Sequence, residues 1–118
     1  MCIKACSKAA LDEITERVCS TAQKLLGDKL EKVLLYGSYA RGDYDEYSDV
    51  DIFILADIPQ EDCCDMGSDI LDFAGDLALE HNILICPSVT SSAIFHKYSQ
   101  ASPYFMNVIK DGVELYAA

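Results

Sequence analysis

The chain has 118 residues, of which 51% are hydrophobic and 25% are charged, which is typical of one globular domain over residues 1–118 and excludes a disordered chain. Its 20 acidic and 9 basic residues give a formal net charge of −11, so we expect no direct non-specific binding of nucleic acid. All apolar runs are shorter than the roughly 18–20 residues that cross a bilayer, and the N-terminal segment lacks the continuous apolar core of a signal peptide. We therefore expect a cytoplasmic protein that binds no membrane.

The predicted elements follow the order helix, strand, strand, helix, strand, helix, helix, strand. Their expected ranges are 7–26, 32–37, 49–56, 60–80, 83–89, 91–100, 103–111 and 113–116. Helical spacing of apolar residues predicts the long helices, and short runs rich in β-branched or aromatic residues predict the strands. The last helix starts at Pro103 and stops before Gly112. The segment between the first two strands is polar and short, with one helical turn after Ser38, so these strands are expected to be antiparallel.

This order of elements predicts an α/β (α+β) fold, in which helices flank a small mixed β-sheet. The second long helix carries an acidic stripe, which we interpret as a solvated face; a docking surface for a basic partner is the alternative. The stripe consists of Asp65, Asp69, Asp72, Asp76 and Glu80.

The six cysteines are expected to be reduced, because a chain rich in aliphatic residues builds a core without disulfides. Their spacing lacks the regular pairs of Cys and His that hold zinc. His81 and His96 are isolated in the sequence, and we expect both at ordinary surface or boundary positions.

Residues 34–54, LLYGSYARGDYDEYSDVDIFI, carry the polar residues that suggest chemistry. Gly37 and Gly42 have the glycine spacing of a P-loop, but Asp43 follows where a P-loop has lysine, which excludes that motif. Counted from Asp43, Ser48 and Ile54 stand where a calcium-binding EF-hand loop requires glycine and glutamate, which excludes an EF-hand.

The segment instead predicts a site in two parts. Gly37 and Ser38 end a buried strand, and the turn that follows can present backbone N–H groups to phosphate. Asp49 and Asp51 are two residues apart on a strand, so both carboxylates face one side. Like charges so close require a cation, and magnesium combines one or two protein carboxylates with water and substrate phosphates. These parts suit phosphoryl or nucleotidyl transfer.

The motif LYGSYARGDYDEYSDVDIFIL, within residues 34–55, resembles that of the minimal nucleotidyltransferases of the DNA polymerase β superfamily, as found in HEPN/MNT toxin–antitoxin pairs. The resemblance extends over nearly the whole chain and implies Mg²⁺-dependent transfer of a nucleoside monophosphate, with AMP from ATP favoured, to a hydroxyl of a protein or small molecule. It implies that Gly37 and Ser38 bind the triphosphate, that Arg41 supports that loop or the phosphates, and that Asp49 and Asp51 are catalytic and bind the metal.

The resemblance also implies a third carboxylate on the strand beside Asp49 and Asp51. The position expected for it near the start of that strand is Asn82, and the other positions on the same face are Leu84, Cys86 and Ser88, none of which is acidic. Asparagine can offer an oxygen to a metal but cannot act as a base. Glu80 is the one nearby substitute, although poorly placed.

Three functions remain open from the sequence. The first is the nucleotidyltransferase, as an antitoxin that modifies a HEPN-type helical partner. The second is a catalytically weakened module that binds NTP and metal and masks a basic helical partner. The third is the catalytic half of an antibiotic-modifying adenylyltransferase, completed by another chain or by homodimerisation. Nucleotide and acceptor identities stay undetermined at this stage.

Overall fold

A mixed sheet of four strands, in the order β3-β2-β1-β4, forms the centre of the fold. The computed structural model describes residues 8–44 and 48–117. The strands are β1 (Leu30–Tyr36), β2 (Val50–Ala56), β3 (Ile85–Ser91) and β4 (Val113–Ala117). The helices are α1 (Lys8–Leu26), α2 (Ser38–Arg41), α3 (Gln60–His81), α4 (Ser92–Tyr98) and α5 (Pro103–Asp111), with a 3-10 turn, η1 (Gly27–Lys29), after α1. The predicted α+β fold with a small mixed sheet is confirmed.

Both kinds of strand pairing occur in the sheet. β1 pairs antiparallel with β2, as the short connection between them predicts, and also with β4. β2 and β3 are parallel, because α3 crosses over from the end of one strand to the start of the other. The two central strands, β1 and β2, therefore have a hydrogen-bonded neighbour on each side.

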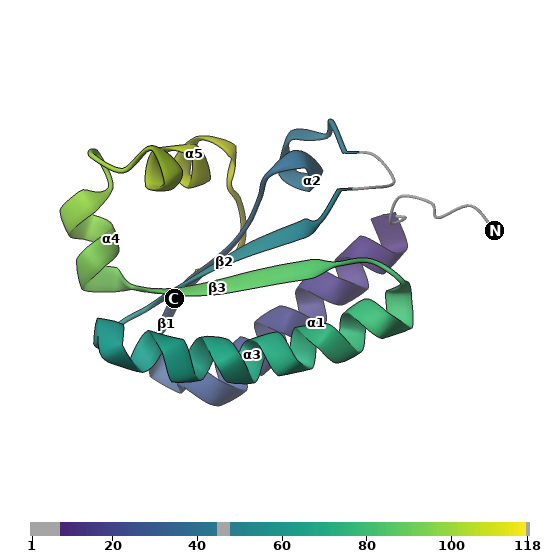
Figure 1. The fold of residues 1–118 in the computed structure, drawn as a ribbon, viewed down its shortest axis with the longest axis horizontal. Coiled ribbons are helices and arrows are strands. Elements are labelled where there is room, and N and C mark those ends of the chain that lie inside the picture. The colour runs from purple at the N-terminus through teal and green to yellow at the C-terminus, as the bar shows by residue number, and fades with distance from the viewer. Residues whose placement is uncertain (1–7, 45–47, 118) are drawn as a thin grey trace.

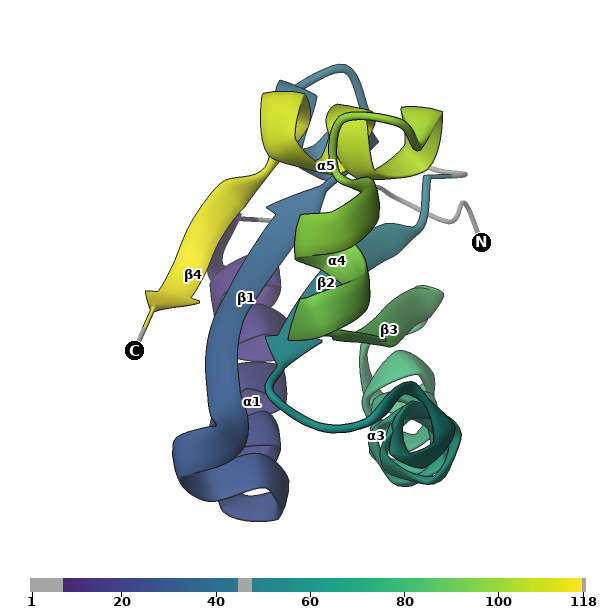
Figure 2. The same ribbon diagram turned by 90° about the vertical axis from the view of Figure 1, so that its left-hand side faces the viewer.

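The helices lie in two layers, one on each face of the sheet (Figures 1 and 2). The long helices α1 and α3 run side by side and cover one face, whereas α4 and α5 lie on the other. Alternate residues of β2 enter the two cores: Val50, Ile52 and Ile54 pack with α1 and α3, and Phe53 and Leu55 pack in the core of α4 and α5. Burial on both faces explains why β2 is apolar almost throughout.

The start of β3 differs from the prediction. Asn82 has a φ of 54° and ends α3 as its C-cap, with its backbone N–H donating to the carbonyl of Ala78. Asparagine is the common alternative to glycine in this left-handed conformation. The strand consequently begins at Ile85 rather than at residue 83, and the prediction that Asn82 occupies a strand position beside the two aspartates is wrong.

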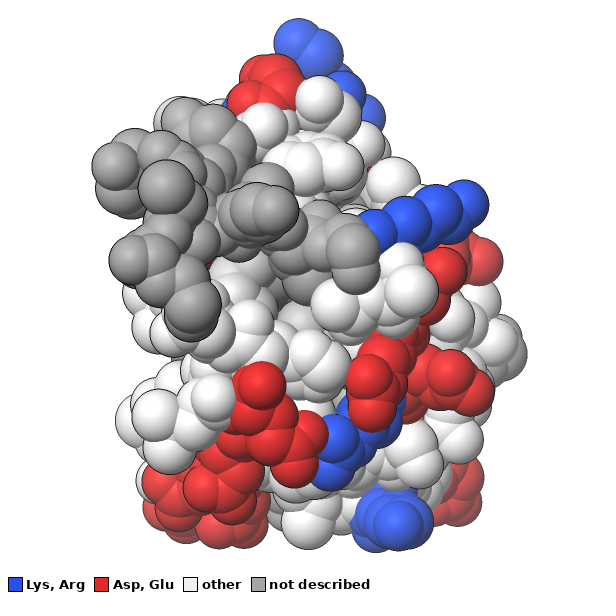
Figure 3. All heavy atoms as spheres, turned by 90° about the vertical axis from the view of Figure 1, so that its right-hand side faces the viewer, with Lys and Arg blue, Asp and Glu red and all other residues white. Residues whose placement is uncertain are grey.

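The charges of the acidic stripe lie on the outer side of the α1/α3 layer. Its aspartates are exposed, and Glu80 accepts a hydrogen bond of 2.7 Å from Arg17 of α1. Figure 3 shows acidic side chains gathered in the lower half of one face, where this layer lies. An exposed stripe fits both interpretations of it, a solvated face and a docking surface.

The cysteines in the described residues are free thiols, as expected, and Cys2 and Cys6 lie outside the described residues. Cys19 and Cys63 are buried. Within residues 8–44 and 48–117, no helix is long and apolar enough to cross a membrane.

Candidate active site

The turn after β1 is built around Gly37. This residue has φ 78° and ψ −155°, a backbone conformation that is essentially restricted to glycine. A Cβ atom at this position would lie 2.5 Å from Oδ2 of Asp51, which is closer than real Cβ contacts allow. Glycine is therefore required twice, once for the backbone angle and once for the approach of the carboxylate.

The helical turn α2 follows directly, as predicted after Ser38. The N–H groups of Ala40 and Arg41 donate to the carbonyl of Gly37 at 3.1 and 3.0 Å, and the N–H of Gly42 donates to the carbonyl of Ser38 at 2.9 Å. Gly42 has a φ of 87° and ends the turn in the left-handed conformation. Ser38 is thereby held at the start of α2, beside the end of β1.

Of the two predicted metal ligands, Asp51 is the second residue of β2 and Asp49 immediately precedes this strand. Asp51 pairs with Tyr36 on β1 and with Cys86 on β3, so its carboxylate is at the middle of the sheet. Partial burial raises the pKa of Asp51, the negative charge of Asp49 raises it further, and the positive charge of Arg41 lowers it. The structure thus brings the predicted carboxylates within electrostatic reach of one another, next to the Gly37 turn.

Arg41 contacts carboxylates on both sides. Its Nε donates to Asp43 at 3.1 Å, and its Nη1 donates to Asp111 at the end of α5 at 3.2 Å. Both hydrogen bonds raise the pKa of the guanidinium. The side chain thus ties α2 to α5 in this structure, and both roles expected for Arg41 stay predictions.

A cavity of about 310 Å³ opens between the Gly37 turn and α5. It is lined by Tyr36, Gly37, Arg41, Tyr104, Asn107, Val108 and Asp111. Two predicted site residues, Gly37 and Arg41, therefore share a hollow with a helix that is remote in the sequence.

Three hydroxyl groups form a cluster on the same face of the sheet, and the sequence analysis missed them. The hydroxyls of Tyr36 and Tyr104 are 2.9 Å apart, and Oγ of Ser88 is 3.3 Å from the hydroxyl of Tyr104. Burial, the bond to Tyr104 and the charge of Asp51 raise the pKa of Tyr36. Antiparallel pairing of the first two strands could have found Tyr36, which pairs with Asp51, but no local signal connects Tyr104 with this site.

The residues present fit magnesium as the metal. Asp49 and Asp51 offer hard oxygen ligands, and magnesium commonly uses one or two protein carboxylates and completes its shell with water and phosphate. Within the described part of the chain, no group of three or more His, Cys, Asp or Glu side chains is placed to hold a metal. The residue that pairs with Asp51 on β3 is Cys86, which has no carboxylate. The carboxylate of Glu80 binds Arg17 in the layer of α1 and α3, on the opposite face of the sheet, so it does not supply the third carboxylate either.

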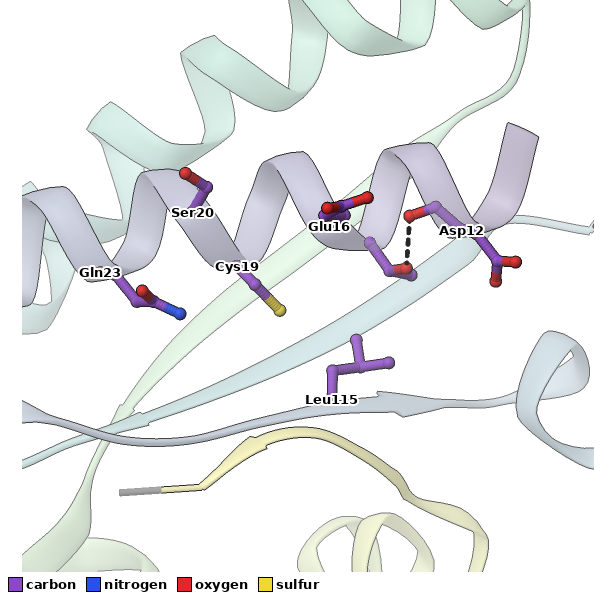
Figure 4. A pocket seen from close by; sticks show the side chains of 7 residues that line it. Asp12, Glu16, Cys19, Ser20, Gln23 and Leu115 are labelled. Atoms are coloured by element: carbon purple, nitrogen blue, oxygen red, sulfur yellow. Dashed lines mark hydrogen bonds between the residues drawn. The ribbon is translucent and has the colours of Figure 1, made fainter. Parts of the chain in front are cut away.

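Another hollow, of about 380 Å³, lies on the opposite side of the sheet, between α1 and β4 (Figure 4). Asp12, Glu16 and Cys19 of α1 line it together with Leu115 of β4. None of the residues that the sequence predicted for the site borders this hollow.

Comparison with known proteins gives a family model and several relatives. Residues 11–97 match the model of a nucleotidyltransferase domain. One "putative protein adenylyltransferase" of Methanocaldococcus jannaschii is 39% identical over 82 residues, which is 70% of this chain and 81% of that protein. A second protein of the same description and organism is 35% identical over 103 residues, which is 87% of this chain and 94% of that protein.

Solved structures share the fold. A chain in a toxin–antitoxin structure determined with AMP-PNP has a TM-score of 0.54 and 21% identity, covering 87% of this chain and 73% of that chain. A "putative nucleotidyltransferase" from Sulfolobus solfataricus has a TM-score of 0.52 and 23% identity, covering 92% of this chain and 78% of that chain.

Proposed function

This chain belongs to the nucleotidyltransferase domain family, and on that premise we propose that it transfers the AMP group of ATP to a hydroxyl of a protein, with Mg²⁺ as its cofactor. The observation that carries the proposal is the contact between the Gly37 turn and the carboxylate of Asp51. A triphosphate on the turn would have its α-phosphate beside the two aspartates, where nucleotidyl transfer requires a metal.

Each predicted residue has one role in this proposal. The turn at Gly37 and Ser38 binds the β- and γ-phosphates through backbone N–H groups and the serine hydroxyl. Asp49 and Asp51 hold the metal, whose charge, when it is bound, offsets the negative charge that develops as pyrophosphate leaves. Arg41 fixes the loop against α5 through Asp111.

Protein rather than small-molecule acceptors are favoured because both relatives described above carry the name "putative protein adenylyltransferase". ATP is favoured as the donor for the same reason. We propose that this reaction takes place in the cytoplasm, where ATP and Mg²⁺ are available.

The direct test uses ATP labelled at the α-phosphate. The full chain is incubated with labelled ATP, Mg²⁺ and lysate of the native host, and transfer of label to protein is expected. The double variant Asp49→Asn, Asp51→Asn should lose the transfer, and EDTA should abolish it in the unchanged chain. The matched control is Asp57→Asn, an exposed aspartate at the other end of β2, which should label normally. Undiminished labelling by the double variant would refute the assignment.

We also propose that the chain acts as an antitoxin toward a basic, HEPN-type helical partner. Two findings support this: one structural neighbour is part of a toxin–antitoxin structure, and α3 presents an acidic stripe. Changing Asp65, Asp69, Asp72 and Asp76 of α3 to asparagine should weaken co-purification of the partner without reducing binding of MgATP.

Growth rescue separates modification from masking. If the antitoxin acts by chemistry, the Asp49→Asn, Asp51→Asn variant still binds the toxin but no longer restores growth. Full rescue by that variant would instead favour the second function, a module that masks its partner by binding alone. Failure to recover any basic helical partner from the native host would refute the antitoxin proposal.

A further inference from the structure

The hydroxyl of Tyr104 lies over the strand that carries Asp51. Tyr36 on β1 and Ser88 on β3 both bond to it, at 2.9 and 3.3 Å. Since β2 runs between β1 and β3, a hydroxyl that reaches both flanking strands must lie above β2.

The sheet register shows where along β2 it lies. Tyr36 pairs with Asp51, and Ser88 pairs with Phe53 two residues further on. The ring of Tyr104 makes an edge contact with that of Phe53, with 6.3 Å between centroids. The Tyr104 hydroxyl therefore lies over β2 in the stretch from Asp51 to Phe53, on the face of the sheet that carries the Asp51 side chain.

Tyr104 also remains accessible from the site. It lines the 310 Å³ cavity together with Gly37 and Arg41, and it is 43% exposed. Tyr98 and Tyr44 are similarly exposed, at 43% and 41%, but neither lines this cavity. Position, not exposure, distinguishes Tyr104 from these other tyrosines.

The chemistry of a phenol suits a site in which the described residues place no third carboxylate beside Asp49 and Asp51. An ordinary tyrosine hydroxyl ionises near pH 10, whereas bulk water, like an alkyl hydroxyl, ionises only near pH ~15.7. A phenolic acceptor thus depends less on a strong general base. The residue beside Asp51 on β3 is Cys86, which offers no carboxylate for that role.

We propose that Tyr104 is an internal acceptor and that the chain adenylylates itself at this hydroxyl, an inference that rests on the proposed function. Oη of Tyr104 forms a bond to the α-phosphorus of ATP, and the bond from that phosphorus to the oxygen bridging to the β-phosphorus breaks. Pyrophosphate leaves, the phenolic proton passes to water, and the product is an AMP ester of tyrosine.

Self-modification has a consequence for turnover. An AMP group on Tyr104 remains within the cavity beside Gly37 and Asp51, where the next ATP would bind. The modified chain should therefore bind MgATP more weakly than the unmodified chain, and transfer to other proteins should slow as modification accumulates.

The test is intact-mass and peptide mass spectrometry of the purified full chain after incubation with ATP and MgCl₂. The expected result is addition of one AMP group, located at Tyr104. Tyr104→Phe keeps the ring against Phe53 but removes the acceptor, and it should gain no AMP. Tyr98→Phe is the matched control with equal exposure and should be modified like the unchanged chain.

A mixing experiment tests whether the transfer is internal. Asp51→Asn chains, which retain Tyr104, are mixed with active Tyr104→Phe chains, and the Asp51→Asn chains should stay unmodified. Modification of those chains, or an AMP group on a residue other than Tyr104, would overturn the proposal. Labelling of lysate in parallel separates self-modification from the proposed transfer to other proteins. If the chain labels lysate proteins but stays unmodified, only self-modification is overturned. If it does neither, both proposals are overturned.

Discussion

Gly37 and Asp51 lie in such close contact that a Cβ on the glycine would stand 2.5 Å from the carboxylate oxygen of the aspartate. The two residues belong to different halves of the predicted site, the phosphate-binding turn and the metal-binding strand. Their proximity joins the two halves of the site, because the carboxylate of Asp51 occupies the space where any side chain at position 37 would begin.

Replacing Gly37 by alanine should therefore damage the site beyond its effect on stability. We expect a cost of about 1–3 kcal/mol from the backbone angle and, in addition, a displaced Asp51 and loss of measurable MgATP binding by calorimetry. Gly27→Ala is the control, because its φ of +58° is also positive but no atom lies within 4 Å of the added Cβ. Equal MgATP affinity of the two variants would contradict this prediction.

Asp51→Asn should stabilise the metal-free protein at neutral pH. The folded chain holds the Asp51 proton more tightly than the unfolded chain, because its pKa is raised above the ordinary value of 3.8. At pH values above the pKa of Asp51 in the folded chain, the ionised carboxylate destabilises the fold. This destabilisation disappears as the pH falls through that pKa and the carboxylate is protonated. Thermal unfolding in EDTA should show a higher melting temperature for the variant at neutral pH and convergence with the unchanged chain in acid. A pH-independent difference would contradict the assignment, and Asp57→Asn controls for the loss of a charge elsewhere.

Cys86→Asp should add a carboxylate beside Asp51. Cys86 pairs with Asp51 across the parallel strands β2 and β3, at a neighbour spacing of roughly 4.8 Å between strands. We expect tighter Mn²⁺ and Mg²⁺ binding, faster AMP transfer and lower stability without metal, because a third negative charge joins the pair. Cys86→Asn changes the size similarly without the charge and should show none of these gains. Unchanged metal affinity in Cys86→Asp would show that this position does not face the metal.

The link between Arg41 and Asp111 should matter for binding more than for folding. Arg41 is exposed, and ion pairs that solvent screens contribute about 0.2–1 kcal/mol to stability, so Asp111→Asn should lower the melting temperature only slightly. It should weaken MgATP binding several-fold, because it releases α2 from α5. Asp43→Asn removes the other hydrogen bond of Arg41 without touching α5 and should have the smaller effect on affinity. The opposite ranking would assign the main support of the loop to Asp43.

Local sequence was sufficient for the elements and the family. Helical and alternating apolar patterns located the long helices and the strands, and the motif within residues 34–55 identified the family that the comparisons confirm. The same motif named Gly37, Asp49 and Asp51, which the fold brings together, because the short connection between β1 and β2 forces their ends to meet. The roles of these residues stay predictions.

Only the tertiary structure decided what surrounds the aspartates. Asn82 adopts the left-handed conformation and ends α3, so β3 starts later in the chain and Cys86, not Asn82, pairs with Asp51. The backbone conformation of this single residue thus decides which side chain lies beside the aspartate. Tyr104 reaches the site from α5, far along the chain, because α5 packs over β2 through Phe53. Periodicity determines which face a residue occupies within its own element, whereas side-chain contacts between distant elements depend on the packing of the whole chain.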